Sequence, residues 1–189
     1  LLREVPFGLD GDFSHKALIV RLNSDLANNF GNLLNRTISM MKKYFDGVIP
    51  TPAPAGDEDS DLTNKSKEVI GDVRKLYDEL AYNKILQKIW ELVDTTNQYI
   101  DKAGPWNLVK TDEGKERLKT VMYNAAESLR VLGVLLYPFM PESTTSLMKQ
   151  LGVETSIEEQ GMKSIDEWGG LKPGSQTQKA KQVFPRIED

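Results

Sequence analysis

An Asn–Arg pair and a Trp are the side chains in this sequence that are best suited to binding a ligand. Asn32 and Arg36 lie four residues apart in the stretch GNLLNRTISM. In a helix this spacing places two side chains on one ridge, about 6 Å apart. An amide and a guanidinium on such a ridge offer several hydrogen-bond donors to solvent or to a ligand. The residues alone leave open a plain solvated helix face.

Trp106 follows Pro105 in the stretch GPWNLVK, in a predicted break between helices. An aromatic ring on a rigid turn can stack on a flat ligand such as a nucleobase. A Trp that plugs the end of a helical bundle is the alternative. Trp90 falls inside a predicted helix and is expected in the core, and Trp168 is expected to anchor the C-terminal segment.

Residues for other kinds of chemistry are scarce. The chain has no Cys, which excludes a thiolate nucleophile. Its one His, His15, nearly excludes a His-based metal site or a catalytic triad. It contains no Gly-rich phosphate loop. The acids Asp57, Glu58 and Asp59 are predicted to lie in a flexible loop, where they would add solubilising charge. We therefore expect no catalytic residue, metal or cofactor in this segment.

Two helices are predicted in the first third of the chain, and they must position the Asn–Arg pair. Ser14 is a predicted N-cap for a short helix, and Ser24-Asp25 for a longer one that reaches Phe45. The apolar positions of the longer helix fall within roughly a quarter turn. The Asn–Arg pair points away from this stripe. Residues 46–61 are rich in Pro, Gly and acids and are predicted to form an exposed loop.

Further helices are predicted downstream. Residues 61–101 carry two apolar helix faces, with a break near residues 80–84. Pro105 must end the second of these helices because it disfavours the α conformation at Gly104. Thr111 caps a long helix whose second half is apolar nearly all round, so this is the expected central helix.

The C-terminal part contains one more predicted helix and a tail. Pro138 ends or kinks the central helix, and the stretch MPESTTSLMKQLG forms a short helix that stops at Gly152. Residues 153–189 are polar and contain Gly and Pro, and we expect an extended tail that docks on the rest of the molecule. With almost no strand pattern, the fold class is an all-α helical bundle.

The composition suits one soluble domain. The chain has 189 residues, 39% of them hydrophobic, and a formal net charge of −4. No apolar run approaches the roughly 20 residues that span a bilayer, so we expect no membrane partner. The absence of Cys fits a reducing compartment. The acidic balance argues against a general nucleic-acid binder, although a local basic ridge stays compatible with it.

Several blocks of this sequence resemble the anticodon-binding domain of methionyl-tRNA synthetases. The first is DGDFSHKALIVRLNSDLANNFGNLLNRTISMMKKYFDG; NQYIDKAGPWNLVK, LYPFMPESTTSLMKQLG and FPRI follow in the same order as in that family. The resemblance covers nearly the whole chain. It implies the anticodon-binding helical bundle of class I aminoacyl-tRNA synthetases, with an extended C-terminal tail. The opening LLREVPFG, without an initiator Met, resembles the joint that follows the family's catalytic domain, so we expect a segment of a longer protein.

The resemblance implies roles for three residues. Asn32, Arg36 and Trp106 would recognise the anticodon CAU, chiefly its first base, a cytosine. Asn29, Lys43 and Asn97 are only candidate neighbours of that site. The implied organisation is a joint at residues 1–13, a helical anticodon-binding domain at 14–152 and a tail at 153–189 that docks on the bundle or on the catalytic domain.

The implied parent enzyme is a methionine–tRNA ligase, which joins methionine to its tRNA with ATP and magnesium. The catalytic motifs of the family do not occur here, and GMKSI at 161–165 matches one of them only by chance. The implied partners are the anticodon loop of methionine tRNA and the enzyme's own catalytic domain. The cytoplasm is the expected location, with an organelle left open.

Two other interpretations remain open at this point. The chain could be the corresponding domain of a sibling class I synthetase, against which the Asn32/Arg36 pair and Pro105-Trp106 argue. It could also be a helical protein–protein interaction module, which the negative charge would suit. A basic strip beside Trp106 would favour RNA, and an exposed apolar groove would favour a protein partner.

Overall fold

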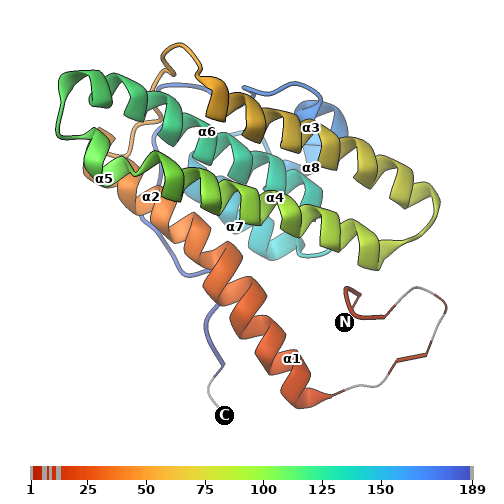
Figure 1. The fold of residues 1–189 in the computed structure, drawn as a ribbon. Helices are drawn as coiled ribbons and strands as arrows, with labels where there is room; N and C mark the ends of the chain where they lie inside the picture. Colours follow the sequence, from red (N-terminus) through yellow and green to blue (C-terminus); the bar gives the residue numbers. More distant parts are fainter. Residues whose placement is uncertain (1, 6–7, 9, 12–13, 188–189) are drawn as a thin grey trace.

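The computed structural model describes residues 2–5, 8, 10–11 and 14–187 as a bundle of helices (Figure 1). Within these residues the β contacts amount to one bridge, between Val48 and Gln176. The predicted all-α fold is confirmed. Parts of two predicted segments lie outside the described residues: 1, 6–7, 9 and 12–13 of the joint, and 188–189 of the tail.

The first long helix is one continuous rod made of α1 (His15–Arg21), η1 (Leu22–Gly31) and α2 (Asn32–Phe45) (Figure 1). Ser14 caps it as predicted, because its Oγ accepts a hydrogen bond from the N–H of Ala17 at 3.2 Å. The prediction that a second helix starts at Ser24-Asp25 was wrong, because the helix continues through these residues. Ser24 Oγ instead donates to the Asp25 carboxylate, and the chain passes through in a π-helical conformation.

Helices α3 (Asp57–Asp78) and α4 (Tyr82–Ala103) form an antiparallel pair, and both helices pack against α6 (Asp112–Leu136). The helix begins at Asp57, so the loop predicted to reach residue 61 ends earlier. The assignment of Asp57, Glu58 and Asp59 to a flexible loop was wrong, because all three lie in the first turn of α3. Asp57 and Glu58 are exposed, as expected of solubilising charge, but Asp59 is only 2% exposed. Its carboxylate caps α3 through the N–H of Gly56 at 2.6 Å and pairs with Arg117, which is distant in sequence.

The central helix is α6 (Asp112–Leu136), as predicted, and nearly all of its second half is buried. Thr111 caps it by accepting a hydrogen bond from the N–H of Gly114 at 3.1 Å. A single turn, α5 (Pro105–Leu108), connects it to α4. Trp90 of α4 is in the core, as expected, with 6% of its surface exposed.

The C-terminal part begins with α7 (Pro141–Leu151), which ends at Gly152 in the left-handed conformation, as predicted. The tail is not extended throughout. Two short helices, α8 (Ile157–Gln160) and η2 (Met162–Ile165), precede an irregular segment that runs back along the bundle (Figure 1).

A buried carboxylate holds the start of this irregular segment. Glu127 of α6 is fully buried and accepts hydrogen bonds from the N–H groups of Gly169, Gly170 and Leu171 at 2.8 to 2.9 Å. Arg130 donates to the same carboxylate from Nε at 2.9 Å and Nη2 at 2.7 Å. A Cβ at Gly170 would lie 2.5 Å from the Arg130 guanidinium, which explains a glycine at this position.

The rest of the tail packs along the bundle and reaches the first long helix. Trp168 donates from Nε1 to the Asn124 side chain at 3.1 Å and so anchors the tail, as expected. Further on, the Phe184 ring lies 5.9 Å from the ring of Phe30, and Arg186 donates to the Asn28 side chain. The tail therefore contacts the helical turns just before Asn32.

Among the described residues, the helices are all too short or too polar to cross a membrane.

Replacing Asp59 by Asn tests whether its buried carboxylate stabilises the bundle. Burial by itself raises the pKa of Asp59, but hydrogen bonds from Arg117, Tyr99 and the Gly56 N–H outweigh it and hold the pKa below its usual value. The stabilisation is therefore present at neutral pH and is lost as pH falls through the lowered pKa. We expect Asp59→Asn to lower the free energy of unfolding by about 2–4 kcal/mol at neutral pH.

Urea unfolding followed by circular dichroism from neutral pH to about pH 3 measures this effect. The difference between the two proteins should shrink below about pH 4, where the wild type loses its advantage. A difference that stays constant across the range would contradict an ionised Asp59 as its source.

Candidate nucleic-acid interface

The candidate site lies where the first long helix and α4 run side by side in the same direction. Asn29 donates to Asp94 at 2.7 Å, and Arg36 donates to Asp101 at 2.6 Å, each pair 65 residues apart in sequence. Asn97 also donates to the Asn29 side chain at 2.8 Å. Equal spacing of the pairs shows that the two helices are parallel and in register along this polar seam.

Arg36 is held within the seam by an acid that lies near the end of α4. Its guanidinium forms an ion pair with Asp101, and its side chain is 27% exposed, whereas that of Asp101 is 60% exposed. Ala103 closes the helix two residues later. The ion pair therefore holds the Arg36 side chain beside the last turn of α4.

Asn32 lies one turn before Arg36 on the outer face of the rod. It is exposed, and within the described part of the chain its side chain makes no hydrogen bond. Leu33 and Leu34 beside it are buried, so the apolar stripe and the polar ridge separate as the helical spacing predicts. The Asn32 amide is thus free to donate and accept hydrogen bonds.

Trp106 lies on the elbow formed by Gly104, Pro105 and α5 that joins α4 to α6. It is 48% exposed, so it does not plug the bundle, which was the alternative. Gly104 has a φ of +55°, a conformation that favours glycine, and a Cβ there would lie 3.9 Å from the indole ring. The ring therefore lies close to the backbone of the elbow with much of its surface open to solvent.

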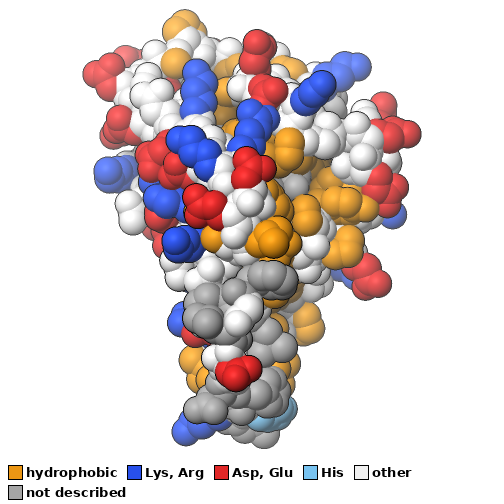
Figure 2. All heavy atoms as spheres, turned by 90° about the vertical axis from the view of Figure 1, so that its right-hand side faces the viewer, with side chains coloured by type: hydrophobic (Ala, Val, Ile, Leu, Met, Phe, Trp, Pro, Cys, Tyr) orange, Lys and Arg blue, Asp and Glu red, His pale blue; other side chains and the backbone are white. Residues whose placement is uncertain are grey.

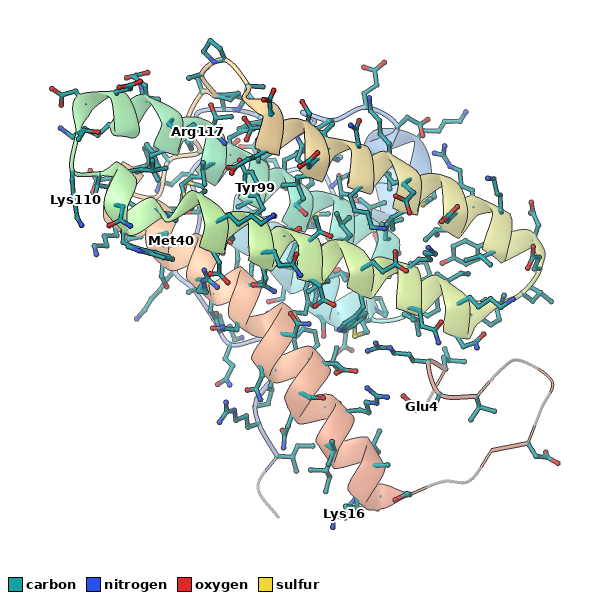
Figure 3. The ribbon with its side chains drawn as sticks, in the orientation of Figure 1. Glu4, Lys16, Met40, Tyr99, Lys110 and Arg117 are labelled. Carbon is teal, nitrogen blue, oxygen red and sulfur yellow. The ribbon has the colours of Figure 1, made fainter. Side chains whose placement is uncertain are left out.

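Exposed lysines surround this end of the molecule. Lys102 precedes the elbow and Lys110 follows it, and Lys42 and Lys43 lie in the last turn of α2. Figure 3 shows Lys110 and Met40 of α2 at the same end of the bundle. Lys102 and Lys110 thus lie on either side of Trp106 along the chain, and the exposed acids Asp101, Asp112 and Glu113 lie next to them.

An apolar hollow lies elsewhere, on the side of the molecule shown in Figure 2. It has a volume of about 400 Å³ and is lined by side chains of the N-terminal segment, the first long helix, α4 and the turn before α7, among them Leu18, Leu22, Leu26, Leu86, Trp90 and Met140. Figure 2 shows hydrophobic side chains gathered in a band on this face. The apolar surface that would suit a protein partner therefore lies apart from the elbow that carries Trp106.

The structure brings Asn32 and Arg36 together on one ridge and places Trp106 on the adjoining elbow. Sequence reasoning missed Asp94 and Asp101, because local spacing gives no signal for partners 65 residues away. Two of the candidate neighbours, Asn29 and Asn97, lie in the seam. The described residues contain no group of His, Cys, Asp or Glu arranged to hold a metal ion.

Comparison with known proteins agrees with this geometry. Residues 49–189 match the family model described as the anticodon binding domain of methionyl tRNA ligase, and residues 1–38 match the model for class I tRNA synthetases (M). The methionine–tRNA ligase of Caldanaerobacter subterraneus subsp. tengcongensis is 46% identical over 188 residues, which are 100% of this chain and 29% of the relative. That of Bacillus subtilis is 42% identical over 189 residues, 100% of this chain and 28% of the relative.

Solved structures give the same result. The apo form of Mycobacterium tuberculosis methionyl-tRNA synthetase superposes with a TM-score of 0.92 at 34% identity, over 100% of this chain and 38% of that chain. Its complex with methionyl-adenylate gives a TM-score of 0.90 over 98% of this chain and 36% of that chain.

The fold is therefore that of an anticodon-binding helical bundle from a class I aminoacyl-tRNA synthetase. More specifically, the chain belongs to the methionyl-tRNA ligase family and corresponds to its anticodon-binding domain. It spans less than a third of the length of these curated relatives. The sibling-synthetase interpretation does not fit these matches.

The ion pair between Arg36 and Asp101 leads to a prediction about RNA affinity. Because Asp101 neutralises Arg36 and repels phosphate, Asp101→Asn should tighten binding to any RNA stem-loop by about 3- to 10-fold at low salt. It should also reduce the difference between loops of different sequence. Fluorescence anisotropy with labelled stem-loops measures both quantities.

Asp78→Asn is the matched control. It removes the same charge from an exposed Asp at the end of α3, which Figure 1 shows at the opposite end of the bundle from α5. Equal tightening by the two variants would mean that only net charge matters and that the contact with Arg36 does not.

Proposed function

We propose that this chain recognises the anticodon of methionine tRNA, CAU, and chiefly its first base. One observation carries the proposal: the Arg36–Asp101 ion pair holds the ridge of Asn32 and Arg36 against the last turns of α4, and the elbow with the exposed Trp106 follows directly after α4. Two polar groups and one open aromatic face are what a splayed, single-stranded base requires. The lysines around the elbow add charge for the neighbouring phosphates.

Each side chain has a distinct part in this proposal. Trp106 stacks on the base, a contact that contributes about 1–3 kcal/mol. Asn32 supplies the donor and acceptor that recognise a base edge. Arg36 donates to the base or to a phosphate, and its contact has a similar free energy. Arg36 must then leave Asp101 or share its donors with it, which makes the acid a competitor of RNA.

We further propose that the chain is the non-catalytic part of a methionine–tRNA ligase that uses ATP and magnesium in the cytoplasm. In that enzyme, residues 1–13 form the joint with the catalytic domain, 14–152 the anticodon-binding domain and 153–189 the tail. The names of the relatives and the match of residues 1–38 to the class I synthetase model support this assignment.

The apolar hollow suits the second proposed partner, the enzyme's own catalytic domain. It is lined partly by Leu2, Arg3 and Glu4, within the predicted joint, and by the first long helix. These residues fall in the region that matches the class I synthetase model. The protein–protein contact proposed at this face is therefore internal to the ligase, and it leaves the elbow free for tRNA.

The test is a comparison of two anticodon stem-loops, one with CAU and one with its first base replaced. At low salt, about 50 mM, we expect the chain to prefer CAU, with affinity falling steeply as salt rises. Trp106→Ala should weaken CAU binding by about tenfold or more and remove most of the preference. Fluorescence anisotropy of the labelled RNA gives the dissociation constants.

Leu80→Ala serves as the control, because Leu80 is also an exposed hydrophobic residue, 46% exposed, in the turn between α3 and α4. It should bind like the wild type. Equal affinity of the wild-type chain for both loops would refute recognition of the first base. A preference that survives Trp106→Ala would refute the stacking role.

A further inference from the structure

A buried network of polar side chains joins three helices at the end of the bundle that carries the elbow. Asp59 of α3 accepts hydrogen bonds from the Tyr99 hydroxyl of α4 at 2.5 Å and from Arg117 of α6 at 2.6 Å. Asn124, also of α6, donates to Asp59 at 3.1 Å and to the Tyr99 oxygen at 3.2 Å. Figure 3 shows Tyr99 and Arg117 close together in this region.

Burial and ionisation both favour a rigid network. Asp59 and Tyr99 are 2% and 5% exposed, so water competes little for their hydrogen bonds. Burial, followed by the adjacent Asp59 carboxylate, raises the pKa of Tyr99, so its hydroxyl keeps the proton that it donates. Asp59 itself stays ionised because its donors outweigh the effect of burial on its pKa.

Tyr99 also lies on the last turns of α4, opposite the polar seam. It is two residues before Asp101, and two residues correspond to about 200° around a helix. The end of α4 is therefore held from two sides, by Tyr99 against Asp59 inside the bundle and by Asp101 against Arg36 at its surface. Ala103 and the elbow follow directly.

The other side of the elbow is fixed through α6. A Cβ at Gly114 would lie 2.2 Å from the carbonyl oxygen of Leu108, so the end of α5 lies directly against the first turn of α6. Arg117 follows Gly114 by less than one turn and ends in the Asp59 carboxylate. Both ends of the elbow thus lead back to Asp59.

We propose that Asp59, Tyr99 and Arg117 are positioning residues that fix the Trp106 elbow in the orientation needed for base recognition. Asp59 and Tyr99 are buried, and the Arg117 guanidinium is bound to Asp59, so the three residues act through α4 and α6. The consequence for RNA rests on the proposed function, whereas the rigidity of the elbow does not.

Tyr99→Phe isolates the network because it removes one hydroxyl and keeps the buried ring. Hydrogen–deuterium exchange with mass spectrometry on the 189-residue chain, without RNA, measures the elbow directly. We expect amides of residues 103–110 to exchange on the order of tenfold faster in the variant. Peptides from α7 and from the start of α4 should exchange as in the wild type.

Tyr123→Phe is the matched control. Tyr123 of α6 is also 5% exposed, and its hydroxyl donates one hydrogen bond, to the Leu171 carbonyl at 2.7 Å. The variant removes the same hydroxyl at the contact between α6 and the tail, and it should leave hydrogen–deuterium exchange at residues 103–110 unchanged. Unchanged exchange at the elbow in Tyr99→Phe, or an equal rise in both variants, would overturn the proposal.

Stem-loop binding provides the second measurement. Tyr99→Phe should reduce the ratio of affinities for the CAU loop and the loop with a replaced first base by about threefold or more, and Tyr123→Phe should leave that ratio intact. A full ratio in Tyr99→Phe would overturn the positioning role in recognition even if exchange rises. A wild-type chain without preference would refute the proposed function, and the exchange experiment would still decide the rigidity of the elbow.

Discussion

The parallel contact between the first long helix and α4 is the constraint on which the candidate site depends. Pairs 65 residues apart face one another along it, first Asn29 with Asp94 and then Arg36 with Asp101. Because the helices are in register, the ridge of Asn32 and Arg36 reaches the level at which α4 ends and the elbow with Trp106 begins. A shift of either helix by one turn would move the ridge away from the indole by about 5.4 Å. Residues from two family matches, 1–38 and 49–189, thus contribute to a single surface.

Two buried carboxylates hold the elements around this contact. Asp59 joins α3, α4 and α6 near the elbow, and Glu127 joins α6 to the tail. Each carboxylate is satisfied by several donors and by an arginine, which is the condition under which a buried charge is tolerated. The tail that Glu127 fixes reaches the turns before Asn32, where Phe184 packs on Phe30. Buried hydrogen bonds and ion pairs, as well as apolar packing, therefore hold the helices that carry the candidate site.

Much of the fold followed from helical periodicity and capping residues in the sequence. Ser14, Thr111 and Gly152 begin or end helices as predicted, because caps act through local backbone geometry. The start predicted at Ser24-Asp25 was wrong, since Asp25 pairs with the arginines Arg3 and Arg21. Asp59 was placed in a loop because it ends a stretch rich in Pro, Gly and acids without helical periodicity, and the sequence gives no signal for its distant partner Arg117. Periodicity could place Asn32 and Arg36 off the core, but it gave no hint that Asp101 neutralises Arg36. The roles of Asn32, Arg36 and Trp106 in binding RNA stay predictions.

The central claim is that the exposed indole of Trp106 meets the anticodon base. The chain contains three Trp residues, so labelling with 5-fluorotryptophan gives three fluorine resonances, and Trp106→Phe assigns the one of interest. Addition of the CAU stem-loop should shift the Trp106 resonance strongly through the ring current of a stacked base, and Trp90 and Trp168 should change little. A Trp106 resonance that stays in place while the stem-loop is fully bound would contradict the account.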